Sequence, residues 1–356
     1  MRRFALPLAV TVVAVLIVAG LLYGIGRVAG VGPFAPGVPA SWLFLAISRG
    51  GEEGDAREIE VIDLATGERP PLFPLDDRAF DLALSRDRRT LYVGTTNARV
   101  FELDAQRGVF LGEIKLAGGG DVRRLLVLPD GGRLLAVVAG ATDASAALVD
   151  LGARRETGRL SLGNRIIGQS VAGRDVVLAT SDRGRVEQLL TLDLDPLRVR
   201  DELILSSLDV PSAPRTAAPS LRLARDGSIV ALSPFALRLT AVAIGSGERR
   251  SADIPTSGIR AGAPFPGFDA DLTLANGDAV VHFCVGTSQR AERFVAPRET
   301  LRGERVGTEC GRYASLRDGS VYLAVRGKPE LRELDPTTGV SRRTLALAGF
   351  AQRVAY

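Results

Sequence analysis

The chain has 356 residues, 24% of them charged, and a formal net charge of +4 from 45 basic and 41 acidic residues. With 46% hydrophobic residues it can build a large core, in one long domain or in two shorter ones. Arginine is interspersed with aspartate and glutamate throughout, which argues against a nucleic-acid-binding protein. One histidine and two cysteines exclude a four-ligand zinc site made from those residues alone, and we expect no metal.

The first predicted element is an uncharged segment at residues 4–26, "FALPLAVTVVAVLIVAGLLYGIG". As a helix it would span roughly 34 Å, which is enough to cross a bilayer core. It exceeds the apolar part of a cleavable signal peptide, so we expect residues 1–27 to form an uncleaved anchor; a cleaved signal sequence and a secreted protein are the alternative. Arg2 and Arg3 predict a cytoplasmic N-terminus, with the rest of this single-pass protein outside the cell membrane.

Residues 28–40 are rich in glycine and proline and are interpreted as a linker, and residues 41–356 form the predicted folded domain. In that domain an Asp that ends a strand and opens a turn recurs at a spacing of about 45 residues. The copies contain Asp63, Asp104, Asp150, Asp193 and Asp335, with "VAIGSGE" at 242–248 as a degenerate copy. This spacing is typical of a four-stranded propeller blade.

A second repeated pattern alternates with the first. It consists of two apolar strands around a polar turn, as in "LLVLPDGGRLLAVVA", and its Asp-Gly or Asn-Gly pairs are typical of tight hairpins. We expect this hairpin to join the first two strands of a blade, and the Asp turn to join the third to the fourth. "SWLFLAIS" at 41–48 then matches a second strand, and "GFAQRVAY" at 349–356 matches a first strand. The prediction is an all-β, seven-bladed propeller of four-stranded blades whose C-terminal strand closes the ring.

These two alternating patterns resemble the YVTN/quinoprotein-dehydrogenase-like group of β-propellers, which are relatives of the WD-repeat fold. The resemblance covers residues 41–356 and implies the fold, but very little about function. Blades four to six match poorly, and Trp42 is the only tryptophan, so the tryptophan docking pattern of true quinoprotein alcohol dehydrogenases is missing. We expect no cofactor.

Two long loops provide the first candidate binding residues. They lie at 209–220 and 255–271, each between the last strand of one blade and the first strand of the next, so we expect them side by side at one mouth of the central channel. Tolerated insertions are the alternative. The residues that would offer charge and aromatic area are Arg215, Arg260, Phe265 and Phe268.

A ring of polar side chains on the first strands of the blades is the second candidate. Alignment on the hairpin turns places Asp81, Arg124, Ser220 and Arg312 at one position, with Gln352 as the equivalent in the closing blade. Such a ring would bind a polar or anionic ligand, and salt bridges between blades are the alternative.

We expect structural roles for the remaining reactive side chains. Cys284 and Cys310 are expected toward the same face in neighbouring blades, and outside the membrane they predict a disulfide. The single histidine, His282, lies in an alternating strand pattern and is expected to be structural, and no nucleophile motif accompanies it.

The sequence therefore predicts a membrane-anchored, extracytoplasmic propeller that binds a protein partner or a small polar ligand at the loop face without catalysis. Two other classes stay open. One is an enzyme, either a quinone-cofactor dehydrogenase or a lactonase or other hydrolase, although fold alone is a weak basis for that assignment. The other is a structural subunit of a larger membrane assembly.

Overall fold

The computed structural model describes residues 37–355 apart from 52–53, 174, 183–185, 208–218, 225, 235, 244–245, 255–268, 276–277, 286–289, 299, 308–310, 316–319 and 337. The predicted anchor at residues 1–27 and most of the predicted linker lie outside the described residues. Across the part of the chain that is described, no helix is long and apolar enough to cross a membrane.

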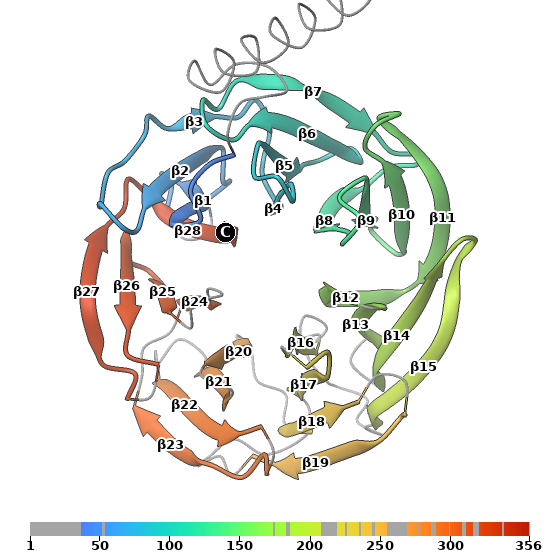
Figure 1. Cartoon of the computed structure of the whole chain (residues 1–356), viewed down its shortest axis with the longest axis vertical. Coiled ribbons are helices and arrows are strands. Elements are labelled where there is room, and N and C mark those ends of the chain that lie inside the picture. Colours follow the sequence, from blue (N-terminus) through green and yellow to red (C-terminus); the bar gives the residue numbers. More distant parts are fainter. Residues whose placement is uncertain are drawn as a thin grey trace, which may run out of the picture.

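The described strands form seven four-stranded sheets arranged around a central axis (Figure 1), so the prediction of an all-β propeller is confirmed. The first three sheets along the chain contain β1 (Trp42–Ser48), β2 (Glu58–Asp63) and β3 (Phe73–Pro74); β4 (Asp81–Leu84), β5 (Thr90–Gly94), β6 (Arg99–Asp104) and β7 (Phe110–Lys115); and β8 (Asp121–Val127), β9 (Arg133–Ala139), β10 (Ala144–Asp150) and β11 (Arg155–Gly163).

The next two sheets contain β12 (Arg165–Ala172), β13 (Val176–Asp182), β14 (Val186–Leu194) and β15 (Leu197–Ser207); and β16 (Ser220–Leu223), β17 (Ile229–Ser233), β18 (Arg238–Val242) and β19 (Arg249–Asp253). The last two contain β20 (Asp269–Ala275), β21 (Asp278–Val285), β22 (Arg290–Pro297) and β23 (Glu304–Gly307); and β24 (Gly311–Ser315), β25 (Val321–Val325), β26 (Glu330–Leu334) and β27 (Ser341–Ala346). The final strand, β28 (Phe350–Ala355), returns to the first sheet.

The ring is closed by strand pairing between the two ends of the domain. β28 pairs antiparallel with β1, so the strand order of this sheet is β28-β1-β2-β3. The innermost strands, β28, β4, β8, β12, β16, β20 and β24, each contact the next one around the axis. The expectation that residues 41–48 form a second strand and that the C-terminus supplies the missing first strand is confirmed. With β28 in place, β1 is paired on both sides and the first sheet has four strands like the others.

The Asp turns of the repeat join the third strand to the fourth, as the sequence predicts. In the turn between β6 and β7, the Gly108 amide donates to the Asp104 carbonyl at 2.7 Å, while Asp104 Oδ1 accepts two further turn amides at 2.9 Å. The turns at 63–67 and 335–339 contain the same backbone bond. The degenerate copy keeps it too, since the Gly247 amide donates to the Ala243 carbonyl at 3.1 Å. These aspartates are therefore explained by turn geometry.

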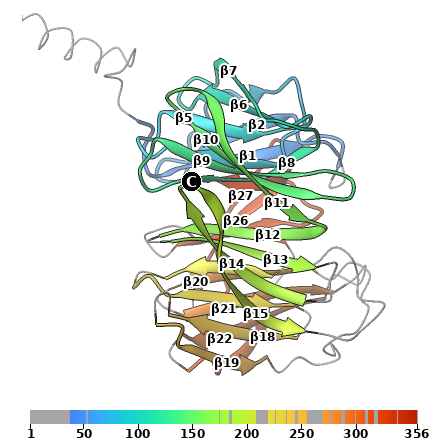
Figure 2. The same cartoon turned by 90° about the vertical axis from the view of Figure 1, so that its right-hand side faces the viewer.

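The disc has two different faces, and Figure 2 shows it from the rim with the strands running across its thickness. We define the hairpin face as the one that carries the turns from first to second strand and from third to fourth strand. The loop face carries all other connections, including those from sheet to sheet. Because β1 starts and β28 ends at the hairpin face, the described chain both begins and ends there.

The core lies between neighbouring sheets. One cluster joins the first two sheets through buried side chains of β1, β2, β4, β5 and β6, among them Phe44, Leu91 and Phe101. A second cluster joins the first sheet to the last through Leu43, Leu45 and Tyr322. Each blade thus buries its apolar faces against its two neighbours, as expected where no single sheet can cover itself.

Gly108 allows a test of this packing, because its φ is +68° and an added Cβ would lie 2.1 Å from a ring carbon of Phe73. Replacing Gly108 by Ala should lower the free energy of unfolding by about 2 kcal/mol, through the left-handed backbone and the steric clash. Gly132 is the matched control, since nothing lies within 4 Å of a Cβ placed there, and Gly132→Ala should change stability by less than about 0.5 kcal/mol. Urea unfolding of both variants measures the difference, and equal effects would contradict this packing.

Candidate functional site

The inner-strand ring predicted from the sequence has the expected register in four blades. Asp81 pairs with Gly94, Arg124 with Val137, Ser220 with Leu232 and Arg312 with Ala324. The closing blade corrects the prediction, because Arg353 pairs with Ala46 and takes the place expected for Gln352. The register shifts there between Ala46 and Ile47, and no hairpin turn follows β28 from which the sequence could be aligned.

Side chains of this ring connect each blade to the backbone of the next. Arg353 Nε donates to the Phe80 carbonyl at 2.6 Å, and Asp81 Oδ2 accepts the Leu125 amide at 2.8 Å. Arg124 Nε in turn donates to the Gly168 carbonyl. Three successive junctions are therefore joined in the same way. For these residues the geometry favours a role in holding blades together, which was the alternative to ligand binding.

The carboxyl group of Asp81, which is half-buried in its strand, has the perturbed pKa in this series. Burial raises the pKa of Asp81, and the nearby guanidinium groups of Arg124 and Arg353 oppose that rise without cancelling it. An acid with a raised folded-state pKa stabilises the fold below its unfolded-state pKa, and loses that contribution as pH rises through the folded-state value.

Asp81→Asn should therefore change the pH dependence of stability. From about pH 4, the usual pKa of an unfolded aspartate, upward through the raised folded value, the wild type should lose stability relative to Asp81→Asn. The expected loss is on the order of 1 kcal/mol and is measured by urea unfolding across this pH range. Asp201→Asn on the exposed outer strand β15 is the control. A wild type that gains stability over Asp81→Asn as pH rises would contradict this assignment.

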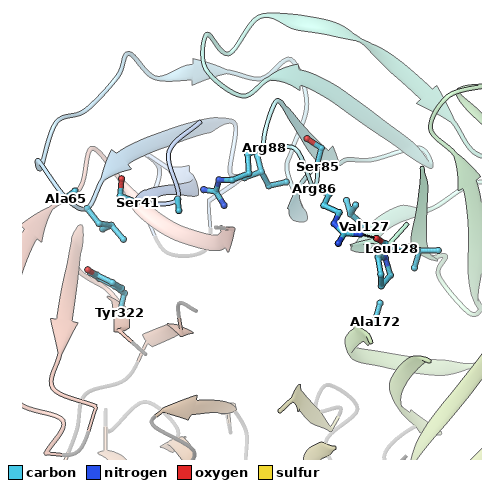
Figure 3. Close-up of a pocket in the computed structure, with 13 residues that line it drawn as sticks. Ser41, Ala65, Ser85, Arg86, Arg88, Val127, Leu128, Ala172 and Tyr322 are labelled. Carbon is cyan, nitrogen blue, oxygen red and sulfur yellow. Dashed lines mark hydrogen bonds between the residues drawn. The ribbon is translucent and has the colours of Figure 1, made fainter. Parts of the chain in front are cut away.

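A cavity of about 820 Å³ opens at the hairpin face of the ring (Figure 3). This volume lies in the range of small-ligand sites. It is lined from the first four sheets and the last by Ala40, Ser41, Leu64, Ala65, Leu84, Ser85, Arg86, Arg88, Val127, Leu128, Pro129, Ala172 and Tyr322. Most of these residues stand where an inner strand ends or where the next strand begins.

Arg88 fixes one wall of the cavity. Its Nε donates to the Val38 carbonyl at 3.0 Å and its Nη2 to the Pro39 carbonyl at 2.9 Å, while the Val38 amide donates to the Arg88 carbonyl at 2.9 Å. The chain that leads into β1 is thereby held against the turn between β4 and β5. Gly37 permits the close approach, because a Cβ there would lie 2.0 Å from the Asp87 carbonyl oxygen.

The turn that carries the two arginines is itself braced. Ser85 Oγ donates to Asp87 Oδ1 at 2.6 Å and accepts the amide of Thr90 at 2.9 Å. Arg88 has a φ of +59°, in the left-handed region, and its side chain lines the cavity. In Figure 3 Arg88 extends toward Ser41, and Arg86 extends toward Leu128 on the next blade. Arg86 Nη1 donates to the Pro129 carbonyl.

The lining combines positive charge with apolar surface. It contains two arginines, two serines and a tyrosine, and the residues described as lining it include no aspartate or glutamate. Asp87 lies just outside, where its carboxylate accepts from Ser85 and is 3.8 Å from Arg89. Leu84, Val127 and Leu128 form the apolar part of the wall. Such a lining favours an anion with an apolar portion.

The cavity lies at the mouth opposite to the one where the sequence predicts binding. Long sheet-to-sheet loops belong to the loop face, and Arg215, Arg260, Phe265 and Phe268 lie outside the described residues, so their role stays a prediction. The lining arginines were missed because the hairpin turns were treated as scaffold only. The signal was present in "SRDRRT" at 85–90, which has three arginines where other hairpins have glycine.

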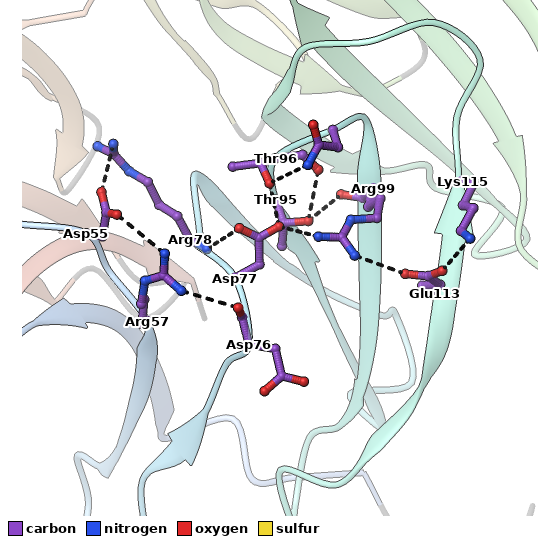
Figure 4. Close-up of polar contacts among 11 residues, drawn as sticks. Asp55, Arg57, Asp76, Asp77, Arg78, Thr95, Thr96, Arg99, Glu113 and Lys115 are labelled. Carbon is purple, nitrogen blue, oxygen red and sulfur yellow. Dashed lines mark hydrogen bonds and ion pairs between the residues drawn. The ribbon is translucent and has the colours of Figure 1, made fainter.

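A polar network at the loop face has a structural explanation (Figure 4). Asp77, in the connection from β3 to β4, accepts from Thr96 Oγ1 at 2.5 Å and from Arg99 at 2.6 Å, and its other oxygen accepts the Arg78 amide at 2.7 Å. Burial alone would raise the pKa of Asp77, but these hydrogen bonds outweigh it and lower the pKa. One oxygen of this carboxylate thus fixes the connection from β3 to the second sheet, and the other accepts the amide of the next residue.

The other chemistry-bearing residues of the sequence lie in β21 or outside the described part. His282 and Cys284 fall within β21, where His282 pairs with Asp271 and Arg293 across the sheet. Cys310 lies outside the described residues, so the disulfide stays a prediction. Among the residues that are described, no group of three or more His, Cys, Asp or Glu side chains could hold a metal ion.

No protein-family model and no curated protein sequence matches this chain. Solved structures do share its fold. A periplasmic gluconolactonase from Pseudomonas aeruginosa, PpgL, superposes with a TM-score of 0.64 at 16% identity, covering 88% of this chain and 98% of that one. A putative 6-phosphogluconolactonase from Bacteroides fragilis gives 0.63 at 11% identity, covering 88% and 96%.

A third similar structure is the dihydro-heme d1 dehydrogenase NirN in complex with DHE, with a TM-score of 0.59 at 17% identity. The alignment covers 89% of this chain and 65% of that one, so the chain spans a little under two thirds of NirN. At these identities the comparisons establish a β-propeller fold and leave function to the site itself.

Proposed function

We propose that this protein is a ligand-binding propeller that holds an organic anion in the hairpin-face cavity. The observation that carries the proposal is a lining with Arg86 and Arg88 and, among the described lining residues, no carboxylate. A carboxylate or phosphate group would bind at these guanidinium groups through charge-assisted hydrogen bonds. The apolar part of the ligand would contact Leu84, Val127 and Leu128.

The two arginines have different parts in this proposal. Arg88 is held by the carbonyls of Val38 and Pro39, so its position is set before any ligand arrives. Arg86 is exposed, and its Nη1 donates to the carbonyl of Pro129. Arg86 can therefore turn toward a ligand at small cost, and it should contribute more of the selectivity for anions.

We also propose to which group of propellers this chain belongs and where it is located. We place the chain among the seven-bladed, YVTN/quinoprotein-dehydrogenase-like propellers, because seven four-stranded sheets surround the axis and the Asp turns recur between the third and fourth strands. Tethering outside the cell membrane is supported by the uncharged run at residues 4–26.

Thermal denaturation in the presence of matched ligands tests the proposal. Gluconate, 6-phosphogluconate, octanoate and hexyl phosphate serve as anions, and glucose and octanol serve as their neutral counterparts. A bound anion at one hundred times its dissociation constant stabilises the fold by about 2.7 kcal/mol, which raises the midpoint by several degrees. Stabilisation by the anions alone is expected. Equal stabilisation by the neutral compounds would contradict the proposal. So would the absence of stabilisation by any of the four anions.

Hydrolysis of a sugar lactone is a second candidate, because two of the similar structures are described as a gluconolactonase and a putative 6-phosphogluconolactonase and are covered almost completely. The product of such a reaction is an organic anion, which the same lining would bind. Release of acid from gluconolactone, followed at constant pH above the uncatalysed rate, decides this candidate. The Arg86→Ala variant shows whether any such activity uses the cavity.

A further inference from the structure

An exposed apolar strip lies at the rim of the hairpin face. It consists of Val109, Phe110 and Leu111, at the point where the third-to-fourth turn of the second sheet enters β7, and their side chains are 55%, 55% and 50% exposed. The Phe110 ring also packs edge-on against Phe101 of the neighbouring strand β6, with ring centroids 5.4 Å apart. Three consecutive exposed apolar residues on an outer strand indicate a contact surface.

A second exposed apolar side chain lies on the same face. Val340, in the third-to-fourth turn of the last sheet, is 65% exposed. The first sheet lies between Val340 and the strip, and Arg343 Nη1 links the last sheet to it by donating to the Leu64 carbonyl at 3.2 Å. Apolar side chains thus stand on both sides of the sheet where the chain enters the propeller.

The chain that precedes the described residues reaches the propeller at this face. Gly37 and Val38 lie against the turn between β4 and β5, fixed by Arg88. The uncharged run ends at residue 26, and residues 27–36 can span at most roughly 35 Å. If the run spans a bilayer, the hairpin face is the part of the propeller that this short connection holds nearest to the membrane surface.

We propose that the hairpin face of the first, second and last sheets rests on the lipid bilayer, with Val109, Phe110 and Leu111 inserted at the interface. The exposed side chain of Arg107 lies in the same turn as the strip, where it would meet lipid phosphates. The Asp104 carboxylate of this turn is already engaged by two turn amides. Because the short tether would already hold the propeller at the membrane, the contact is effectively intramolecular. A small apolar strip is then sufficient for docking.

This arrangement would place the mouth of the cavity toward the membrane surface. The anion proposed above would then arrive from, or be delivered to, the bilayer, and an anionic amphiphile would fit both the arginines and the apolar wall. That consequence rests on the proposed function, whereas the docking of the strip does not.

Depth-dependent quenching in the full-length chain tests the docking. The protein carries Trp42→Phe, so that a single new tryptophan reports, and it is reconstituted into phosphatidylcholine–phosphatidylglycerol vesicles with or without brominated acyl chains. Phe110→Trp places the reporter in the strip. Ile204→Trp is the matched control, because Ile204 is 53% exposed and lies on β15 of the fourth sheet, toward the loop face. Brominated lipid should reduce emission from position 110 by roughly half or more and leave position 204 unchanged.

The other outcomes overturn the proposal. Emission from position 110 that brominated lipid does not reduce, in vesicles that retain the protein, shows that the strip faces water, a second copy or a protein partner. If the full-length protein does not associate with vesicles, the membrane tether on which the docking depends does not exist. Anion binding to the cavity, measured by the thermal shift above, is independent of either result and identifies which of the two proposals has failed.

Discussion

A chain that ends at Gly349 should lose cooperative unfolding and should be recovered as oligomers or aggregates. Residues 350–355 form β28, the strand that completes the first sheet and pairs with β1 from Phe44 to Ser48. Its removal leaves the edge of β1 unpaired at the axis, where Phe44 and Leu45 are completely buried in the intact protein. An unpaired apolar edge is a template for pairing with another chain.

The effect should be large because closure is a property of the whole ring. The truncation also removes the bond from Arg353 to the Phe80 carbonyl. Together these losses are comparable with the full stability of a typical domain, about 5–15 kcal/mol. Light scattering coupled to size exclusion and a thermal melt measure the result, with a chain ending at Ala355 as control. A monomer whose melt matches that of the control would show that closure contributes little.

Arg86→Glu should weaken binding of the best anion at least about 100-fold, because it replaces a charge-assisted hydrogen bond by repulsion between like charges. Arg86→Ala should lose about tenfold, since it removes the attraction alone. Calorimetric titration measures both. Arg86 is exposed at the cavity mouth, so the fold should tolerate either change.

Arg198→Glu provides the control for net charge. Arg198 lies on the outer strand β15, away from the cavity, and its side chain is 3.0 Å from Asp193. Binding unchanged in Arg198→Glu and weakened in Arg86→Glu assigns the effect to the cavity. Equal weakening in both variants would instead indicate a non-specific attraction between the protein and the anion.

The sequence was sufficient for most of the scaffold. Its repeat predicts the propeller, the hairpin and Asp turns, and closure by the C-terminal strand, because each depends on local patterns that recur: alternating apolar residues, Asp at the end of a strand, and Gly where φ is positive. Even the degenerate turn at 243–247 keeps its backbone bond.

The site was not predictable in the same way. A cavity forms where side chains from several blades meet. Neither Ser41, just before β1, nor Tyr322, on β25, has a sequence pattern that places it in the same cavity as Arg88. The shift at Arg353 arose likewise from a long-range pairing, since the register of β28 is set by β1, more than 300 residues earlier. Spacing along the chain gives no information on either.

The most direct test of the binding site is hydrogen exchange of the intact protein with and without a bound anion. A bound anion should protect the amides at 38, 40–41, 85–89 and 127–128, in the segments that line the hairpin-face cavity. Protection confined to the long loops at 209–220 and 255–271, with the hairpin-face segments unchanged, would place the ligand at the opposite mouth and contradict this expectation.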